Sequence, residues 1–239
     1  MDISQMTVLV TGAASGIGHA LANGFLDDGA RVVGVDINAD GLEPLANRGA
    51  VTLSVDVSDP AQVDDMVRAA LDQTGSLEVL INNAGLGFAR LVVDHKPEEF
   101  EQLLRVNLFG PFYCMRAAIP VMREEGFGRI INVVSRHAES GASAFAAYGS
   151  SKAGLWALTR HAASETRDEN IRINCLIPGP TRTGMLPRGQ EPELVYPTAR
   201  MLATLPLDGP TGKVFWNEKE YVLFDPANES YRREFPRRR

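Results

Sequence analysis

Three side chains suited to proton transfer, Ser135, Tyr148 and Lys152, lie within eighteen residues of one another. Tyr148 and Lys152 are four residues apart, so on a helix both side chains lie on one face, one turn apart. A free tyrosine has a pKa of about 10, and a neighbouring ammonium lowers that pKa because it favours the phenolate. We expect Ser135 to hold a substrate oxygen against Tyr148. Each residue also has a common structural use, on a solvated helix face or in a turn.

The elements around this trio predict that its members converge. An apolar run over 130–134 has the character of a buried parallel strand, and Ser135 follows it directly. After a loop, a helix is expected to begin near Ala146 and to carry Tyr148 and Lys152. The strand end and the first turn of the helix then meet at one edge of a sheet.

A glycine-rich turn follows the first predicted strand, residues 6–10, and precedes a helix. Gly12 lets the chain turn tightly, Gly16 lets the backbone approach a pyrophosphate, and Gly18 lets the helix pack closely on the strand. The amides at the helix start attract phosphate groups. The turn therefore predicts a dinucleotide site.

Asp36 ends the second predicted strand, residues 30–35, about twenty positions after this turn. A carboxylate there is placed to accept hydrogen bonds from the adenosine ribose hydroxyls and to repel a 2′-phosphate. This favours NAD as the cofactor, with NADP as the alternative. The competing interpretation is that Asp36 or Asn38 caps the following helix.

Strands and helices alternate along the rest of the chain. Further strands are expected over 51–55, 77–81 and 173–177, and Ser58 or Asp59 with Pro60 signals a helix start. A long helical segment over 97–123 contains Asn107, and Pro111 and Pro120 should kink or interrupt it. This order predicts an α/β fold with a doubly wound parallel sheet in three layers, forming a single domain over 1–239.

Composition and charge exclude several classes of function. The chain has 239 residues and a net charge of −6, which argues against nucleic-acid binding. Cys114 and Cys175 form neither a disulfide framework nor a metal site, so no metal is expected. No segment has the length and apolarity of a membrane span or an export signal, so we predict a cytoplasmic protein. The arginine-rich residues 225–239 are expected to form a flexible tail, with an anion or partner contact as the alternative.

With these motifs assembled, the sequence resembles the short-chain dehydrogenase/reductase family. The resemblance is carried, in order, by the Thr-Gly-x-x-x-Gly-Ile-Gly turn at 11–18, Asn-Asn-Ala-Gly at 82–85, Asn107, Ser135, the Tyr148/Lys152 pair and Pro178-Gly179. It covers nearly the whole chain and implies a Rossmann fold, a nicotinamide cofactor, a small alcohol or ketone substrate and a homodimer or homotetramer. The helices on either side of the Ser135 strand are the implied dimer interface.

The resemblance also implies roles for individual residues. Tyr148 is the implied acid/base, Lys152 lowers its pKa and holds the nicotinamide ribose, Ser135 orients the substrate oxygen, and Asn107 holds a water in a proton relay. Asp56 and Val57 are implied to contact adenine, Asn83 the adenosine ribose, and Thr183 the nicotinamide carboxamide. The remaining implied cofactor contacts are Ser15, Ile17, Ala84, Gly85, Pro178, Gly179 and Thr181. Asn83 has a structural alternative, in which its side chain bonds loop backbone, and Asn107 has another, as a helix-kink residue.

Three segments depart from the family pattern. Arg136, His137 and Glu139 follow Ser135 where many members have small or apolar residues. Arg136 is a candidate for binding an anionic or strongly polar substrate, with surface ion pairs as the alternative. The lid segment 181–207 is short, which predicts an open site. The segment 209–224, with a possible turn at 217–218 and an apolar run over 221–224, resembles the ending of carbonyl-reductase-like members, which commonly use NADPH.

These observations together predict an NAD-dependent oxidoreductase that interconverts a secondary alcohol and a ketone, or a primary alcohol and an aldehyde. The first alternative is an NADPH-dependent carbonyl or 3-oxoacyl reductase. The alternative of another class is a catalytically silent dinucleotide-binding sensor or scaffold.

Overall fold

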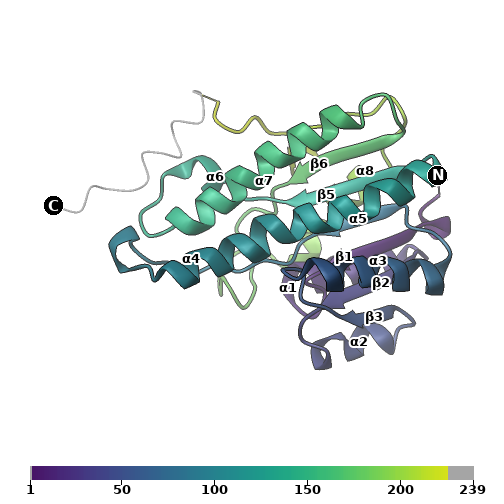
Figure 1. The fold of residues 1–239 in the computed structure, drawn as a ribbon, viewed down its shortest axis with the longest axis horizontal. Coiled ribbons are helices and arrows are strands. Elements are labelled where there is room, and N and C mark those ends of the chain that lie inside the picture. Colours follow the sequence, from purple (N-terminus) through teal and green to yellow (C-terminus); the bar gives the residue numbers. More distant parts are fainter. Residues whose placement is uncertain (1, 226–239) are drawn as a thin grey trace.

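The computed structural model describes residues 2–225 of the chain, and it contains one eight-stranded sheet (Figure 1). The strand order is β3-β2-β1-β4-β5-β6-β7-β8, and only β8 runs antiparallel to its neighbour. The strands are β1 (Thr7–Thr11), β2 (Arg31–Asp36), β3 (Val51–Ser54), β4 (Val79–Asn82), β5 (Gly128–Val133), β6 (Ile171–Leu176), β7 (Val214–Trp216) and β8 (Lys219–Glu220). The predicted doubly wound α/β fold is confirmed.

Helices cover both faces of the sheet (Figure 1). One face packs against α3 (Pro60–Thr74), α5 (Gly110–Glu125) and α7 (Ala146–Glu165), and the other against α1 (Gly16–Asp27), α2 (Glu43–Ala46) and α8 (Tyr196–Ala203). The remaining helical segments are α4 (Pro97–Leu104), α6 (His137–Ser140), a π-helical stretch η4 (Arg105–Phe109), and the 3-10 turns η1 (Ile3–Gln5), η2 (Asp40–Leu42), η3 (Val92–Asp94) and η5 (Pro192–Val195).

The central strands are buried along their whole length, which explains their nearly continuous apolar sequences. Every residue of β1, β5 and β6 is buried, because helices exclude water from both sides of a parallel sheet. Each Val, Leu or Ile side chain removed from water contributes about 1.5–3 kcal/mol. The strands are therefore held in a fixed register, and their carboxyl ends form a defined edge.

Local signals in the sequence set the helix ends near the site. Asp59 caps α3, because its carboxylate accepts hydrogen bonds from the N–H groups of Ala61 and Gln62. Pro111 has no N–H to donate to the carbonyl of Asn107 four residues earlier, and the chain is π-helical over Arg105–Phe109. The predicted interruption at Pro111 is thus present as a local widening, whereas α5 continues through Pro120.

The chain changes direction between β1 and β4. From β1 it builds outward through β2 to β3, then returns to place β4 on the other side of β1 and continues through β5 and β6. The loops that leave β1 and β4 therefore run to opposite sides, which opens a crevice at the carboxyl ends of these strands.

The C-terminal part of the sheet is a tight hairpin. Asn217 and Glu218 join β7 to β8, and both have positive φ angles of 49° and 60°, as the mirror-image hairpin turn requires. The predicted turn at 217–218 is confirmed. The apolar run that follows, Tyr221–Phe224, forms no strand. The predicted flexible tail lies almost entirely outside the described residues.

Candidate active site

The buried amine of Lys152 lies beside the phenol of Tyr148 in the first two turns of α7. The Lys152 Nζ donates a hydrogen bond to the Val133 carbonyl at 2.9 Å and lies 5.8 Å from the centroid of the Tyr148 ring. Burial lowers the pKa of Lys152 from 10.5 to about 8. The predicted convergence of the helix pair with the end of the β5 strand is therefore present.

The pKa of Tyr148 moves opposite to the expected direction. Burial of the phenol raises this pKa, and a hydrogen bond with the Ser135 hydroxyl lowers it only in part. Removing a phenolate from water therefore costs more than the hydrogen bond from Ser135 returns. The predicted net lowering of the Tyr148 pKa is therefore wrong for the protein's own residues, whereas the role of Lys152 in favouring the phenolate stays a prediction.

Asn107 connects the loop after β4 to the catalytic helix. Its side-chain oxygen accepts a hydrogen bond from the Leu86 N–H at 2.7 Å, and its amide donates to the Leu86 carbonyl at 2.8 Å and to Ser151 Oγ at 3.1 Å. Ser151 Oγ in turn donates to the Tyr148 carbonyl at 2.7 Å. Both ends of the Asn107 side chain are thus engaged in positioning, and its expected role in a water relay stays a prediction.

Ser135 and His137 both contact the Tyr148 side chain. The His137 N–H donates to Ser135 Oγ at 3.2 Å, so the start of α6 orients the serine hydroxyl. The His137 ring stacks on Phe145 with centroids 4.4 Å apart and meets the Tyr148 ring edge-on at 5.8 Å. The sequence marked His137 as unusual, but only the fold shows its contact with Tyr148.

The glycine-rich turn packs so closely on its neighbours that side chains larger than hydrogen would not fit. A Cβ atom on Gly12, which has a φ of 70°, would lie 2.8 Å from the backbone of Ala84 and from the Asn83 side chain. A Cβ on Gly18 would overlap the Gly12 carbonyl, and one on Gly16 would lie 3.1 Å from Thr183. Gly12 and Gly18 thus permit close packing of turn, helix and neighbouring loop, while Gly16 faces the cleft.

Asp36 lies at the end of β2 and is bound to the same turn. Its carboxylate accepts a hydrogen bond from the Ala14 N–H at 3.1 Å and another from the Asn38 N–H at 2.9 Å. The next strand places Asp56 nearby, where its carboxylate accepts from the Ser58 N–H at 2.9 Å. Both carboxylates therefore lie at the end of the cleft that the glycine-rich turn begins.

Asn83 uses its side chain structurally, as the alternative interpretation of this residue states. Its amide donates to the carbonyls of Thr11 and Gly12 at 3.0 and 3.3 Å. Thr11 completes the link, because its hydroxyl accepts hydrogen bonds from the N–H groups of Asn83 and Ala84. Thr11 was not among the predicted site residues, although it is the first residue of the glycine-rich motif.

A single cleft of about 590 Å³ joins these groups. The predicted site residues that line it are Gly12, Ser15, Gly16, Ile17, Asp36, Asp56, Val57, Asn83, Ala84, Gly85, Tyr148, Lys152, Pro178 and Thr183. The others, Gly18, Asn107, Ser135, Arg136, Gly179 and Thr181, are not part of its lining. Leu86 and Met185, which lie in loops, and Gln102, which lies in α4, line the cleft without having been predicted, since no motif marks these three residues.

Arg136 extends toward the C-terminal hairpin. Its guanidinium carbon lies 4.9 Å from the Trp216 ring centroid and 5.9 Å from that of Tyr221. Nothing in the cleft lining supports the prediction that Arg136 binds an anionic substrate, and that role stays untested.

The lid segment contributes one short turn to the mouth of the cleft. Met185 packs against Gly87, where a Cβ would lie 2.6 Å from its sulfur and 3.3 Å from the Tyr148 ring. The later part of the segment packs on α1 instead, with Tyr196 and Arg200 both bound to Asp28. Only the early part of the lid segment, before Gln190, can therefore cover the cleft, and the prediction of an open site concerns that part alone.

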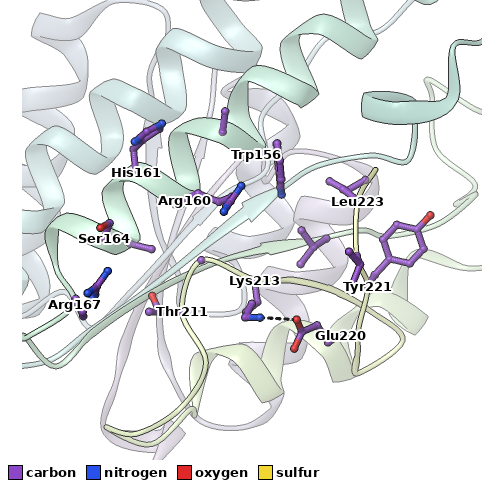
Figure 2. A pocket seen from close by; sticks show the side chains of 15 residues that line it. Trp156, Arg160, His161, Ser164, Arg167, Thr211, Lys213, Glu220, Tyr221 and Leu223 are labelled. Atoms are coloured by element: carbon purple, nitrogen blue, oxygen red, sulfur yellow. Dashed lines mark hydrogen bonds and ion pairs between the residues drawn. The ribbon is translucent and has the colours of Figure 1, made fainter. Parts of the chain in front are cut away.

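A second and larger cavity, of about 800 Å³, lies between α7 and the C-terminal hairpin (Figure 2). Its lining includes Trp156, Arg160, Arg167 and Lys213, but none of the predicted site residues. Size therefore does not identify the functional cleft here, whereas the gathering of acid–base groups does.

The cleft fits a nicotinamide dinucleotide. The glycine-rich turn and the start of α1 form a phosphate cradle, Asp36 lies where an adenosine ribose is held in such folds, and Tyr148 and Lys152 lie at the other end. Within residues 2–225, no group of His, Cys, Asp and Glu side chains could hold a metal ion, and Cys114 and Cys175 are buried free thiols. None of the described helices combines the length and apolarity needed to span a membrane.

Comparison with known proteins agrees with this geometry. Residues 6–193 match the short chain dehydrogenase family. The chain is 35% identical to the 3-oxoacyl-(acyl-carrier-protein) reductase FabG of Thermotoga maritima, over 96% of this chain and 94% of that protein. It is 32% identical to a D-beta-hydroxybutyrate dehydrogenase of Rhizobium meliloti, over 72% of this chain and 70% of that protein.

Among solved structures, the 3-ketoacyl-(acyl-carrier-protein) reductase of Brucella melitensis complexed with NADH superposes with a TM-score of 0.85 at 30% identity. The alignment covers 89% of this chain and 96% of that one. The fold and the site define a nicotinamide-dependent oxidoreductase. The chain belongs to the short-chain dehydrogenase family, whose members use NAD(H) or NADP(H), act on small molecules and are typically oligomeric.

Proposed function

We propose that the protein interconverts a secondary alcohol and a ketone, or a primary alcohol and an aldehyde, with NAD(H) as the preferred cofactor. One observation carries this proposal: Tyr148, which is hydrogen-bonded to Ser135, and the buried Lys152 line the same cleft as Asp36 and the glycine-rich turn. In this fold, a dinucleotide that binds along the cleft would place its reactive ring beside the acid–base groups.

The chain's own residues supply the proton chemistry. During alcohol oxidation Tyr148, as phenolate, removes the hydroxyl proton, and during ketone reduction its phenol returns a proton to the oxygen. Ser135 holds that oxygen through a hydrogen bond. Lys152, which is cationic below a pKa of about 8, favours the phenolate and would bind the nicotinamide ribose. The bound dinucleotide supplies the hydride acceptor or donor.

Asp36 supports the preference for NAD over NADP. Its carboxylate is fixed by two backbone amides and faces the cleft, where a 2′-phosphate would meet a like charge. The relative complexed with NADH supports the same choice. The 3-oxoacyl reductase relatives support the substrate class of the second candidate, an NADPH-dependent carbonyl or 3-oxoacyl reductase, but not its cofactor, and rates with the two cofactors decide between the candidates.

Dimer formation through α5 and α7 is part of the proposal. Phe109 and Phe112 are 41% and 45% exposed at the start of this face, and such aromatic side chains suit a subunit contact. Sedimentation at several protein concentrations measures the oligomeric state, and a monomer throughout would exclude this interface.

Tyr148→Phe tests the mechanism. Removing the hydroxyl deletes the acid/base group while keeping the ring, so turnover should fall by about 10²-fold or more, while NADH binding is retained. Tyr113→Phe, which removes a hydroxyl from α5, is the matched control. A panel of alcohols and ketones, followed by nicotinamide absorbance with both cofactors, identifies the substrate. Near-normal turnover by Tyr148→Phe would rule out the mechanism, and wild-type inactivity on the whole panel would favour the sensor alternative.

A further inference from the structure

The residues after β8 fold back onto α6, the short helix that follows Ser135. The Tyr221 hydroxyl donates a hydrogen bond to one carboxylate oxygen of Glu139 at 2.5 Å, and the Phe224 N–H donates to the other. Burial and this bond to Glu139 raise the pKa of Tyr221 to about 12, so the hydroxyl remains a donor at physiological pH. We call residues Tyr221–Phe224 the C-terminal brace.

A second contact joins α6 to the same hairpin. Arg136, directly before α6, lies over the rings of Trp216 and Tyr221, and these two rings meet edge-on with centroids 5.9 Å apart. The charged residues on both sides of His137 are therefore held by the C-terminal hairpin. This accounts for the polar segment after Ser135 without a substrate contact.

The brace is itself anchored on α7. Leu223 is only 6% exposed, and the Phe224 ring lies 5.2 Å from that of Trp156. Figure 2 shows Trp156 of α7 together with Tyr221 and Leu223 of the brace in the lining of the larger cavity. The brace thus connects the catalytic helix α7 to α6 through the C-terminus.

On its other side α6 touches the acid–base groups. The His137 N–H binds the Ser135 hydroxyl, and the His137 ring packs between Phe145 and Tyr148. The His137 carbonyl also approaches α7 so closely that a Cβ on Gly149 would lie 2.7 Å from it. A displacement of α6 would therefore move the serine hydroxyl relative to Tyr148.

We infer that the C-terminal brace positions the acid–base site, with Glu139 and Tyr221 as positioning residues that hold α6 against Tyr148. A four-residue helix has no stability of its own and depends on such contacts. The part of this inference that concerns kcat rests on the proposed oxidoreductase function. Because a misplacement of about 1 Å in a catalytic group can cost about a hundredfold in rate, loss of the Glu139–Tyr221 bond should lower kcat roughly tenfold.

The test uses the variants Glu139→Gln, Tyr221→Phe and their combination, with Glu101→Gln and Tyr113→Phe as matched controls on α4 and α5. Two quantities are measured: kcat, and the NMR shift of the His137 imidazole protons, which the stacked Phe145 ring displaces. His137→Gln assigns that resonance among the four histidines of the chain. Each brace variant should lower kcat and move the His137 resonance toward its unstacked value. The effects in the double variant should be less than additive, because the Glu139–Tyr221 bond is weakened or lost in each of the three variants.

NADH affinity should not change in these variants, because Asp36 and the glycine-rich turn lie at the other end of the cleft. A His137 resonance unchanged in Tyr221→Phe would overturn the inference whatever the activity. A moved resonance with unchanged kcat would also overturn it, since α6 would then not govern the site. If the wild type turns over no substrate, the proposed function fails while the resonance alone decides whether the brace holds α6.

Discussion

Replacing Asp36 by alanine should change the cofactor preference of the protein. The carboxylate is half-buried at the end of β2 and fixed by the N–H groups of Ala14 and Asn38. No lysine or arginine within residues 2–225 forms an ion pair with it. Its charge is therefore not neutralised locally and acts on any anion that enters this end of the cleft.

The magnitude follows from Coulomb's law. Two unit charges about 5 Å apart interact with about 3 kcal/mol at an effective dielectric of about 20 and with about 0.8 kcal/mol in bulk water. A half-buried carboxylate lies between these limits, so Asp36→Ala should relieve about 1–3 kcal/mol for each phosphate charge. NAD also loses a hydrogen-bond acceptor for its ribose, worth about 1 kcal/mol. The ratio of kcat/KM for NAD to that for NADP should fall at least about tenfold.

Initial rates with each cofactor, at low and moderate salt, measure this ratio, and the effect should be smaller at higher salt. Asp72→Ala, which removes an exposed carboxylate from α3, is the matched control. A thermal melt shows whether the amides left without an acceptor weaken the fold. The reasoning is refuted if the folded Asp36→Ala variant keeps the wild-type ratio within about twofold.

Two further predictions concern stability. Burial lowers the pKa of Lys152 from 10.5 to about 8, so the unfolded chain binds the Lys152 proton more tightly than the folded protein does. The stability of the wild type relative to Lys152→Met should therefore rise as the pH increases from about 8 to 10.5. Thermal melts of both proteins between pH 7 and 10 measure this difference in stability, and a difference that does not change with pH would contradict the prediction. Gly24→Ala in α1 gains about 1 kcal/mol of helix propensity, but its Cβ would overlap the Tyr196 ring, and overpacking costs about 1–3 kcal/mol. We expect a lower urea midpoint for Gly24→Ala, and a higher one would show that Tyr196 moves aside freely.

The sequence alone determined the order of elements and the residues that carry the chemistry. Gly12, Gly16 and Gly18 mark the turn from β1 to α1 because only glycine allows such close approaches of backbone. The four-residue spacing of Tyr148 and Lys152 places them on one face of any helix. These are local constraints, set by a few neighbouring residues, so they can be inferred without knowledge of the fold.

The tertiary structure decided what those residues meet. Glu139 binds Tyr221, which lies 82 positions further along the chain, and Arg136 stacks on Trp216, so the polar segment after Ser135 contacts the C-terminal hairpin. The direction of the Tyr148 pKa also depended on packing, because desolvation is set by every element around the phenol. Contacts between distant segments and the loss of water around a side chain arise only when the chain is folded, and no local pattern encodes them.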